Sequence, residues 1–156
     1  MEVDLALLAD AATIDASGKL NILGVFDRIA TATFPAQHPH MVLILRFTAG
    51  FGEIGPHKVE ISMTDPGGHR IVQLDGDMQL GPGRAGVTEG MKVPHVLHLE
   101  GLVFPTPGRY HFDVRVDGDH HTSVPLHVSG APGRAGGSPP VGGVPSMTGG
   151  TAPAEA

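Results

Sequence analysis

Ten histidines are the residues of this 156-residue sequence best suited to chemistry, because neutral imidazole is a common ligand for zinc, copper and nickel. Their spacing does not gather them into a site. His120 and His121 are consecutive and would point to opposite faces of a strand, while His95 and His98 are three positions apart, a separation that suits a helix. Neither an HExxH motif nor a Cys/His pattern is present. We therefore expect no metal site, and a histidine-rich metal-binding protein is the alternative.

The sequence has no motif typical of nucleophilic or acid–base catalysis. Ser62 and Ser123 could each lie near a histidine in the fold, but there is no GxSxG elbow and no SxxK motif. Asp75 and Asp77 flank a glycine in a turn-rich stretch, where carboxylates more often shape a turn than transfer a proton. The Gly-rich segment 81–86 lacks the Lys-Ser/Thr of a phosphate loop. We predict a protein that is not an enzyme and has no catalytic or cofactor-binding residue, and an enzyme that uses histidine is the alternative.

The elements that must position these side chains are short apolar runs. From Val3 to Val128, runs of about 5 to 10 residues are separated by clusters of Gly, Pro, Asp and Asn, and no window keeps a long helical period. This rhythm predicts strands, although a short helix is the alternative where Leu5, Leu7 and Leu8 lie among alanines. The predicted strands are 3–14, 19–33, 41–48, 57–64, 70–80, 94–99, 109–116 and 120–128, and the segments 34–40 and 81–93 are predicted loops.

The last predicted hairpin shows the clearest alternation of apolar and polar residues. Tyr110 and Phe112 belong to one apolar face, and the polar residues between them belong to the other face. A two-residue turn at Asp117-Gly118 would pair Phe112 with Ser123, whereas a longer loop or an added bulge would pair Phe112 with Val124. Because one buried face demands one register, we predict the second pairing.

On the polar face of this hairpin, the preferred register would place Arg115 opposite His121, with Asp113 two residues along. Such a cluster could bind an anionic group or a carboxylate of a partner. A solvated sheet face with weak cross-strand pairs is the more common outcome, and we expect that here.

Charge and composition exclude several classes of partner. The formal net charge is -6 and no run of Lys or Arg forms the basic stripe of a nucleic-acid-binding protein, so we expect no nucleic acid. The first residues are acidic where a secretory signal is basic, and no apolar run reaches the roughly 20 residues that span a bilayer, so we expect no membrane association. The sequence has no Cys, which fits a reducing compartment, and we predict a cytoplasmic protein.

The last part of the chain, residues 130–156, differs in composition from the rest. It is rich in Gly, Pro and Ala, and its sizeable apolar residues are Val141, Val144 and Met147. Such a segment buries too little apolar area to offset its ordering entropy. We predict one domain over residues 1–129 and a disordered tail over residues 130–156.

Three segments carry a resemblance to a known family. They are residues 2–10, the stretch Leu-Asn-Ile-Leu-Gly-Val-Phe-Asp-Arg-Ile at 20–29, and the stretch from Pro107-Gly108-Arg109-Tyr110 to Val128. In these segments the chain resembles an uncharacterised bacterial domain-of-unknown-function family of small β-sandwich proteins. The resemblance implies a compact bacterial β-domain, and because no activity, cofactor or catalytic residue is established for that family, it implies nothing about function. Residues 107–116 are also similar to late strands of immunoglobulin-like sandwiches.

We predict an all-β fold, an immunoglobulin-like antiparallel β-sandwich with a disordered C-terminal tail. We predict that it acts as a non-catalytic binding or assembly module of a bacterial cytoplasm, with a protein partner or self-association and no cofactor. A small-ligand carrier that holds its ligand between the sheets is a further alternative.

The first predicted strand suggests where such an association occurs. Val3, Leu5 and Leu7 lie on one side of the strand, and Ala6 and Leu8 occupy much of the other side. A strand that is apolar on both sides needs cover on both sides, whereas a two-layer sandwich leaves its outer faces wet. A loop, the tail or another chain could cover the side that carries Leu8, and we expect another chain because the tail and the loops are poor in large apolar residues; the alternative is that Ala6 and Leu8 are exposed.

Overall fold

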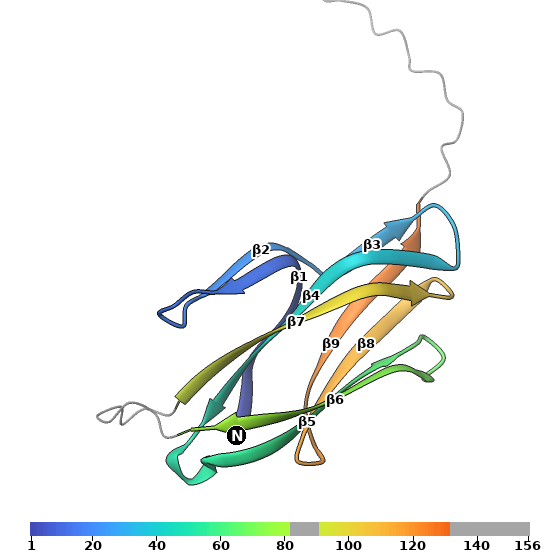
Figure 1. Ribbon diagram of the computed structural model, residues 1–156. Helices are drawn as coiled ribbons and strands as arrows, with labels where there is room; N and C mark the ends of the chain where they lie inside the picture. The colour runs from blue at the N-terminus through green and yellow to red at the C-terminus, as the bar shows by residue number, and fades with distance from the viewer. Residues whose placement is uncertain (82–90, 132–156) are drawn as a thin grey trace, which may run out of the picture.

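The computed structural model describes residues 1–81 and 91–131, and nine strands lie within these ranges (Figure 1). The predicted tail lies outside the described residues from residue 132 onward, and the predicted loop 81–93 does so for residues 82–90. A 3-10 turn, Phe51–Glu53, connects two of the strands. The strands are β1 (Glu2–Ile14), β2 (Leu20–Phe26), β3 (Arg28–Thr31), β4 (Ala36–Ala49), β5 (Gly55–Thr64), β6 (Arg70–Leu80), β7 (Met91–Phe104), β8 (Gly108–Val116) and β9 (Asp119–Gly130).

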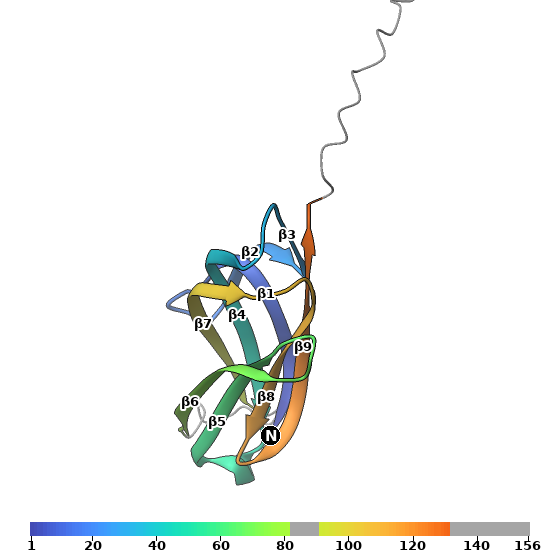
Figure 2. The ribbon, with the colours of Figure 1, turned by 90° about the vertical axis from the view of Figure 1, so that its right-hand side faces the viewer.

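The strands form two sheets that pack as the layers of a sandwich (Figure 2). One sheet has four strands in the order β2-β1-β4-β7, and the other has five in the order β3-β9-β8-β5-β6. The predicted all-β fold is confirmed. Among the described strands every pair is antiparallel except that β3 runs parallel to β9, which corrects the expectation of a wholly antiparallel sandwich. The immunoglobulin-like topology stays a prediction.

The predicted strand 19–33 is wrong as a single element, because the chain changes sheets within it. β2 ends at Phe26 in the four-stranded sheet, and β3 begins at Arg28 on the edge of the five-stranded sheet. Between them, the carbonyl of Asp27 accepts a hydrogen bond from the backbone N–H of His127, at 2.8 Å. The chain therefore crosses from one sheet to the other at Asp27, which already hydrogen-bonds to β9.

The predicted loop 34–40 and the predicted strand 94–99 also need correction. β7 extends beyond 94–99 at both ends, from Met91 to Phe104, so residues 91–93 of the predicted loop 81–93 belong to a strand. β4 begins at Ala36, because the first residues of this strand pair with the end of β7. Pro39 does not end the strand, since it lies opposite Gly101 at a point where the ladder makes no pair. Gly101 has φ +63°, and this local irregularity lets both strands continue in register. β1 is a strand throughout, which excludes the short helix at the N-terminus.

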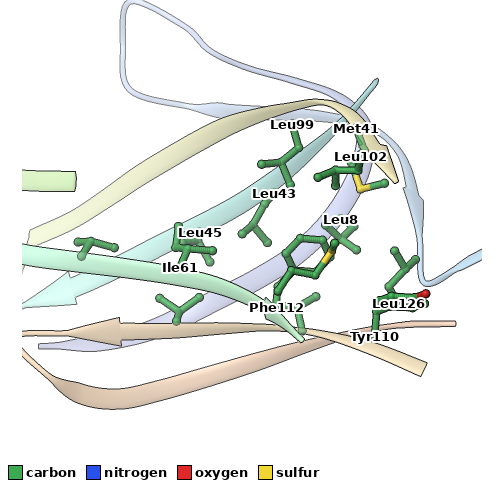
Figure 3. Packing of buried hydrophobic residues seen from close by; sticks show 14 of the residues in the cluster. Leu8, Met41, Leu43, Leu45, Ile61, Leu99, Leu102, Tyr110, Phe112 and Leu126 are labelled. Atoms are coloured by element: carbon green, nitrogen blue, oxygen red, sulfur yellow. The ribbon is translucent and has the colours of Figure 1, made fainter. Parts of the chain in front are cut away.

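The main hydrophobic core lies between the two sheets (Figure 3). Leu43 and Leu45 enter it from β4, and Phe112 and Leu126 enter it from β8 and β9. These four side chains are at most 2% exposed. Among the described residues no polar or charged residue is buried.

A second apolar cluster lies on the outer side of the four-stranded sheet. Val42 and Ile44 of β4 point away from the main core, yet neither is exposed to solvent. Leu20 and Ile22 pack against this cluster from β2, and Figure 2 shows the tip of the β1–β2 hairpin projecting beyond that side of the sheet. The chain thus supplies part of the cover for its own outer face.

The two faces of β1 carry other residues than predicted. The pairing of β1 with β4 shifts register between Val3 and Leu5, so these two residues do not share a face as regular alternation requires. Leu8 is 1% exposed and belongs to the main core, while Leu5 and Leu7 pack against the outer cluster. The expectation that another chain covers Leu8 is therefore wrong.

The β8–β9 hairpin has the predicted register. Phe112 pairs with Val124 as expected. The chain reverses at Asp117 and Gly118, both with positive φ, and a bulge between Val114 and Arg115 keeps the apolar residues of both strands on the core side.

Tyr110 ties the start of β8 to the preceding turn. Its hydroxyl donates a hydrogen bond to the carbonyl of Thr106 at 2.7 Å and accepts one from the backbone N–H of the same residue at 3.3 Å. The ring is fully buried and meets Phe104 edge to face, with ring centroids 5.0 Å apart. A buried tyrosine that bonds back to the backbone just upstream is a recurrent device of Greek-key sandwiches.

Candidate functional site

A row of basic side chains crosses three neighbouring strands of the five-stranded sheet. Arg28 of β3 pairs with His127 of β9, and His127 pairs in turn with Arg109 of β8. Neighbouring strands lie about 4.8 Å apart, so side chains in such a row are adjacent to one another. We call these three residues the basic row.

The basic row lies on the outer face of the sandwich. Each of its residues immediately precedes a residue of the core side, namely Ile29, Tyr110 or Val128. Tyr110 and Val128 are fully buried, and Ile29 packs against the same core. Because side chains alternate along a strand, the residue before each of them points to solvent. The alternation that fills the core therefore also presents the row outward.

The chain itself neutralises this row only weakly. Arg28 Nε lies 3.9 Å from Asp27 Oδ1, and both side chains are 79% exposed, so this ion pair contributes little. The side chain of Arg109 makes no ion pair or hydrogen bond with the part of the chain that the structure describes. A protein with a net charge of -6 thus carries a local patch of positive charge.

The basic row lines a surface hollow of about 330 Å³, together with Asp27 and Pro125. Two guanidinium groups present planar arrays of N–H donors that match a carboxylate or a phosphate, and an imidazole can add another donor. The lining contains no nucleophile beside a base. The arrangement can therefore bind an anion.

The predicted cluster of Arg115, His121 and Asp113 is wrong in one member. A bulge leaves His121 of β9 without a partner on β8, so Arg115 lies opposite His120 instead of His121. His120 Nε2 lies 3.7 Å from Asp113 Oδ1, and Arg115 donates to the carbonyl of Gly118 at 3.3 Å. These charged groups satisfy one another in part, so the cluster is a less open anion site than the basic row.

The serines considered as nucleophiles lie on the same outer face. Ser62 and Ser123 flank Asp113 in one row of the sheet. Ser123 Oγ is 3.4 Å from His111 Nδ1, which is at the long end of the range for a hydrogen bond. The prediction that the protein is not an enzyme stays a prediction.

The carboxylate of Asp117 organises the turn between β8 and β9. Its Oδ2 lies 2.7 Å from His57 Nδ1, and its Oδ1 accepts the backbone N–H of Lys58 at 2.9 Å. The hydrogen bond with His57, followed by that with Lys58, lowers the pKa of Asp117 below its usual value. These bonds join the turn to β5, so the lowered pKa of Asp117 is explained by the structural role of its carboxylate.

The remaining histidines form at most pairs. The rings of His40 and His98 lie 5.5 Å apart on β4 and β7, and His40 Nδ1 lies 4.0 Å from Glu100 Oε1. His95 faces inward and meets Phe47 edge to face. Within residues 1–81 and 91–131, no group of three or more His, Cys, Asp or Glu side chains could hold a metal ion. The expectation of no metal site stays a prediction for the protein as a whole.

Asp75 and Asp77 have different surroundings from those predicted. Asp75 and Asp77 lie inside strand β6 and not in a turn. Gln73 Nε2 donates to the carboxylate of Asp75 at 3.2 Å. The Gly-rich segment 81–86 lies outside the described residues after Gly81. In the described ranges no helix is long and apolar enough to cross a bilayer.

The sequence prediction missed the basic row because its members are far apart in the chain. Arg28 joins the other two through the parallel pairing of β3 with β9, which local alternation does not reveal. The sequence does show that each of the three residues precedes an apolar residue in a predicted strand. That pattern predicts an outward side chain but not its neighbours.

Comparison with known proteins agrees with the resemblance seen in the sequence. The sequence model of a family described as a family of unknown function, DUF6941, matches residues 4–129. No curated protein matches the chain.

Proposed function

Because the chain belongs to DUF6941, a family of unknown function, we propose its role from its geometry: a non-catalytic binding module that recognises an acidic group of a protein partner. The observation that carries this proposal is the alignment of Arg28, His127 and Arg109 on three neighbouring strands. The core of the sandwich determines which face of each of these strands is turned to solvent. The core therefore fixes the backbone positions from which the three side chains point outward.

A carboxylate on a short acidic segment is the ligand that fits this surface best. The hollow is small, at about 330 Å³, and its donors are spread over three strands. A long polyanion such as nucleic acid needs many phosphate contacts, and the net charge of -6 opposes it outside the hollow. A single acidic loop of a partner would avoid most of that repulsion.

We further propose that this module works in a bacterial cytoplasm and has an immunoglobulin-like topology. The sequence has no Cys, which fits a reducing compartment. The parallel β3–β9 pair at one edge of the five-stranded sheet and the Tyr110 hydrogen bonds support an immunoglobulin-like arrangement.

The test is a titration of the full chain with a hexaglutamate peptide at low salt, followed by the backbone amide resonances. We expect shifts on β3, β8 and β9 around the hollow. The double variant Arg28→Gln/Arg109→Gln should bind the peptide at least about tenfold more weakly. Both side chains are exposed, so this variant should fold as the wild type does.

Arg115→Gln is the matched control, because Arg115 is an exposed arginine on the same face of β8. It should keep wild-type affinity. The proposal fails if the peptide shifts no resonance near the hollow, or if Arg115→Gln weakens binding as much as the double variant does. A partner recovered from the native host should depend on the same two arginines.

Self-association is a second candidate, and one observation favours it. Leu23 and Val25 of β2 are 71% and 62% exposed, which is high for large apolar side chains. A second copy that packs on this strand would remove them from water. Sedimentation should then show a dimer that Leu23→Glu dissociates without unfolding the chain, and a monomeric wild type would eliminate this candidate.

A further inference from the structure

A small cavity opens between the sheets at the edge where β6 and β7 lie. β6 is the last strand of the five-stranded sheet, and β7 is the last strand of the four-stranded sheet. The cavity has a volume of about 180 Å³. Leu74, at its edge, is 39% exposed, so solvent reaches the space. Its apolar walls are Val59, Ile61, Leu74, Met78 and Leu97.

The cavity exists because a side chain is missing from the inner row of β6. Leu74 and Met78 point inward, and the inward position between them is Gly76. A Cβ atom built on Gly76 would meet no other atom within 4 Å, and its φ is not in the left-handed region. Backbone geometry therefore does not require glycine here. What glycine provides is space beside Val59, its partner on β5.

One side chain in the wall can form a directional hydrogen bond. His95 lies on the inward face of β7, with its ring against Phe47. Its Nδ1 is 3.3 Å from the carbonyl of Pro94, a long contact. Its Nε2 makes no hydrogen bond to the described residues. An apolar pocket with one convergent polar group is the usual form of a small-molecule site.

We propose that this cavity binds an uncharged, phenol-sized molecule, whose ring fills the space beside Gly76 and whose hydroxyl bonds His95. The volume is close to that of the engineered apolar cavity of about 150 Å³ that binds benzene. Asp75 and Asp77 also line the opening, and with the net charge of -6 they disfavour an anion. This ligand differs in chemistry from the acidic group proposed for the basic row, which lies toward the opposite edge of the five-stranded sheet.

The test uses phenol, toluene and benzoate as probes on the full chain, with backbone amide shifts and thermal melting as readouts. For a ligand this small, a dissociation constant of about 1 mM is expected for phenol. Phenol should shift resonances of β5, β6 and β7 and should raise the melting temperature. Toluene should bind about tenfold more weakly than phenol because it makes no hydrogen bond to His95, and benzoate should not bind.

Three variants separate the contributions of shape and polarity. Gly76→Leu fills the cavity and should abolish phenol binding, and Gly76→Ala should weaken it if the leucine variant does not fold. Gln79→Leu adds the same side chain to an exposed position of β6 and should keep wild-type affinity. His95→Leu should remove the preference for phenol over toluene.

The proposal is overturned if wild type does not bind phenol, if a folded Gly76→Leu still binds it, or if His95→Leu keeps the preference. The double variant Arg28→Gln/Arg109→Gln should bind phenol as wild type does. If the basic row proves not to bind an acidic group, the test of the cavity is therefore unaffected.

Discussion

Replacing Phe112 by Ala should cost about 3 to 5 kcal/mol of folding free energy, because a large side chain leaves a filled core. Phe112 is 2% exposed and pairs with Met63 on one side and Val124 on the other. It therefore lies in the middle of the five-stranded sheet, where little rearrangement can close the space. Domains of this size have a total stability of about 5 to 15 kcal/mol, so the loss is a large fraction of it. The melting temperature should fall by roughly 10 to 20 °C.

The matched control is Asp113→Ala, one residue further along the same strand. Asp113 points to the opposite face, and its neighbour His120 Nε2 is 3.7 Å away, so the loss should stay within about 1 kcal/mol. Urea denaturation followed by far-UV circular dichroism measures both variants, since the chain has no Trp. Equal midpoints for the two variants would refute the assignment of faces on which the core and the basic row both depend.

Three further predictions concern other parts of the fold. Tyr110→Phe removes the two hydrogen bonds with Thr106 and should cost about 1 kcal/mol in the same assay, with no change in the far-UV spectrum. The hydrogen bond with His57 lowers the folded-state pKa of Asp117 below 3.8, so its contribution is complete above that pH and is lost as pH falls through the folded value. Asp117→Asn should thus be less stable than wild type at neutral pH, and the difference should shrink in acid. A chain that ends at Ala131 should melt at the temperature of the full chain, because residues 132–156 are poor in apolar side chains; a clear fall in melting temperature would show that this segment contributes.

Local alternation was sufficient to predict the β8–β9 hairpin. Tyr110 and Phe112 have apolar partners in a single register, and every other register would bring an apolar face beside a polar one. The bulge follows from the same requirement, because a two-residue turn alone gives the wrong pairing. The position of the bulge could not be predicted from the alternation of residues. That position decides whether His120 or His121 lies opposite Arg115.

Features that depend on partners distant in the chain were not predictable in the same way. Residues 19–33 read as one apolar run, but the two halves have different neighbours in the structure. The first half pairs with β1, and the second half pairs with β9, about a hundred residues further along. The basic row exists because of this second pairing. The segments around these residues therefore predict that each side chain points outward, but not that the three lie side by side.

The strand β1 carries apolar residues on both of its sides. The pattern required cover on both sides, and cover is present on both: the main core over Leu8, and the outer cluster beside Leu5 and Leu7. The error was to assign the outer cover to another chain. β1 continues past the end of its pairing with β4, and its hairpin with β2 places Leu20 and Ile22 against that outer cluster. A surface for a second chain must therefore be sought on residues that the hairpin leaves exposed, and the apolar side chains of Leu23 and Val25 are such residues.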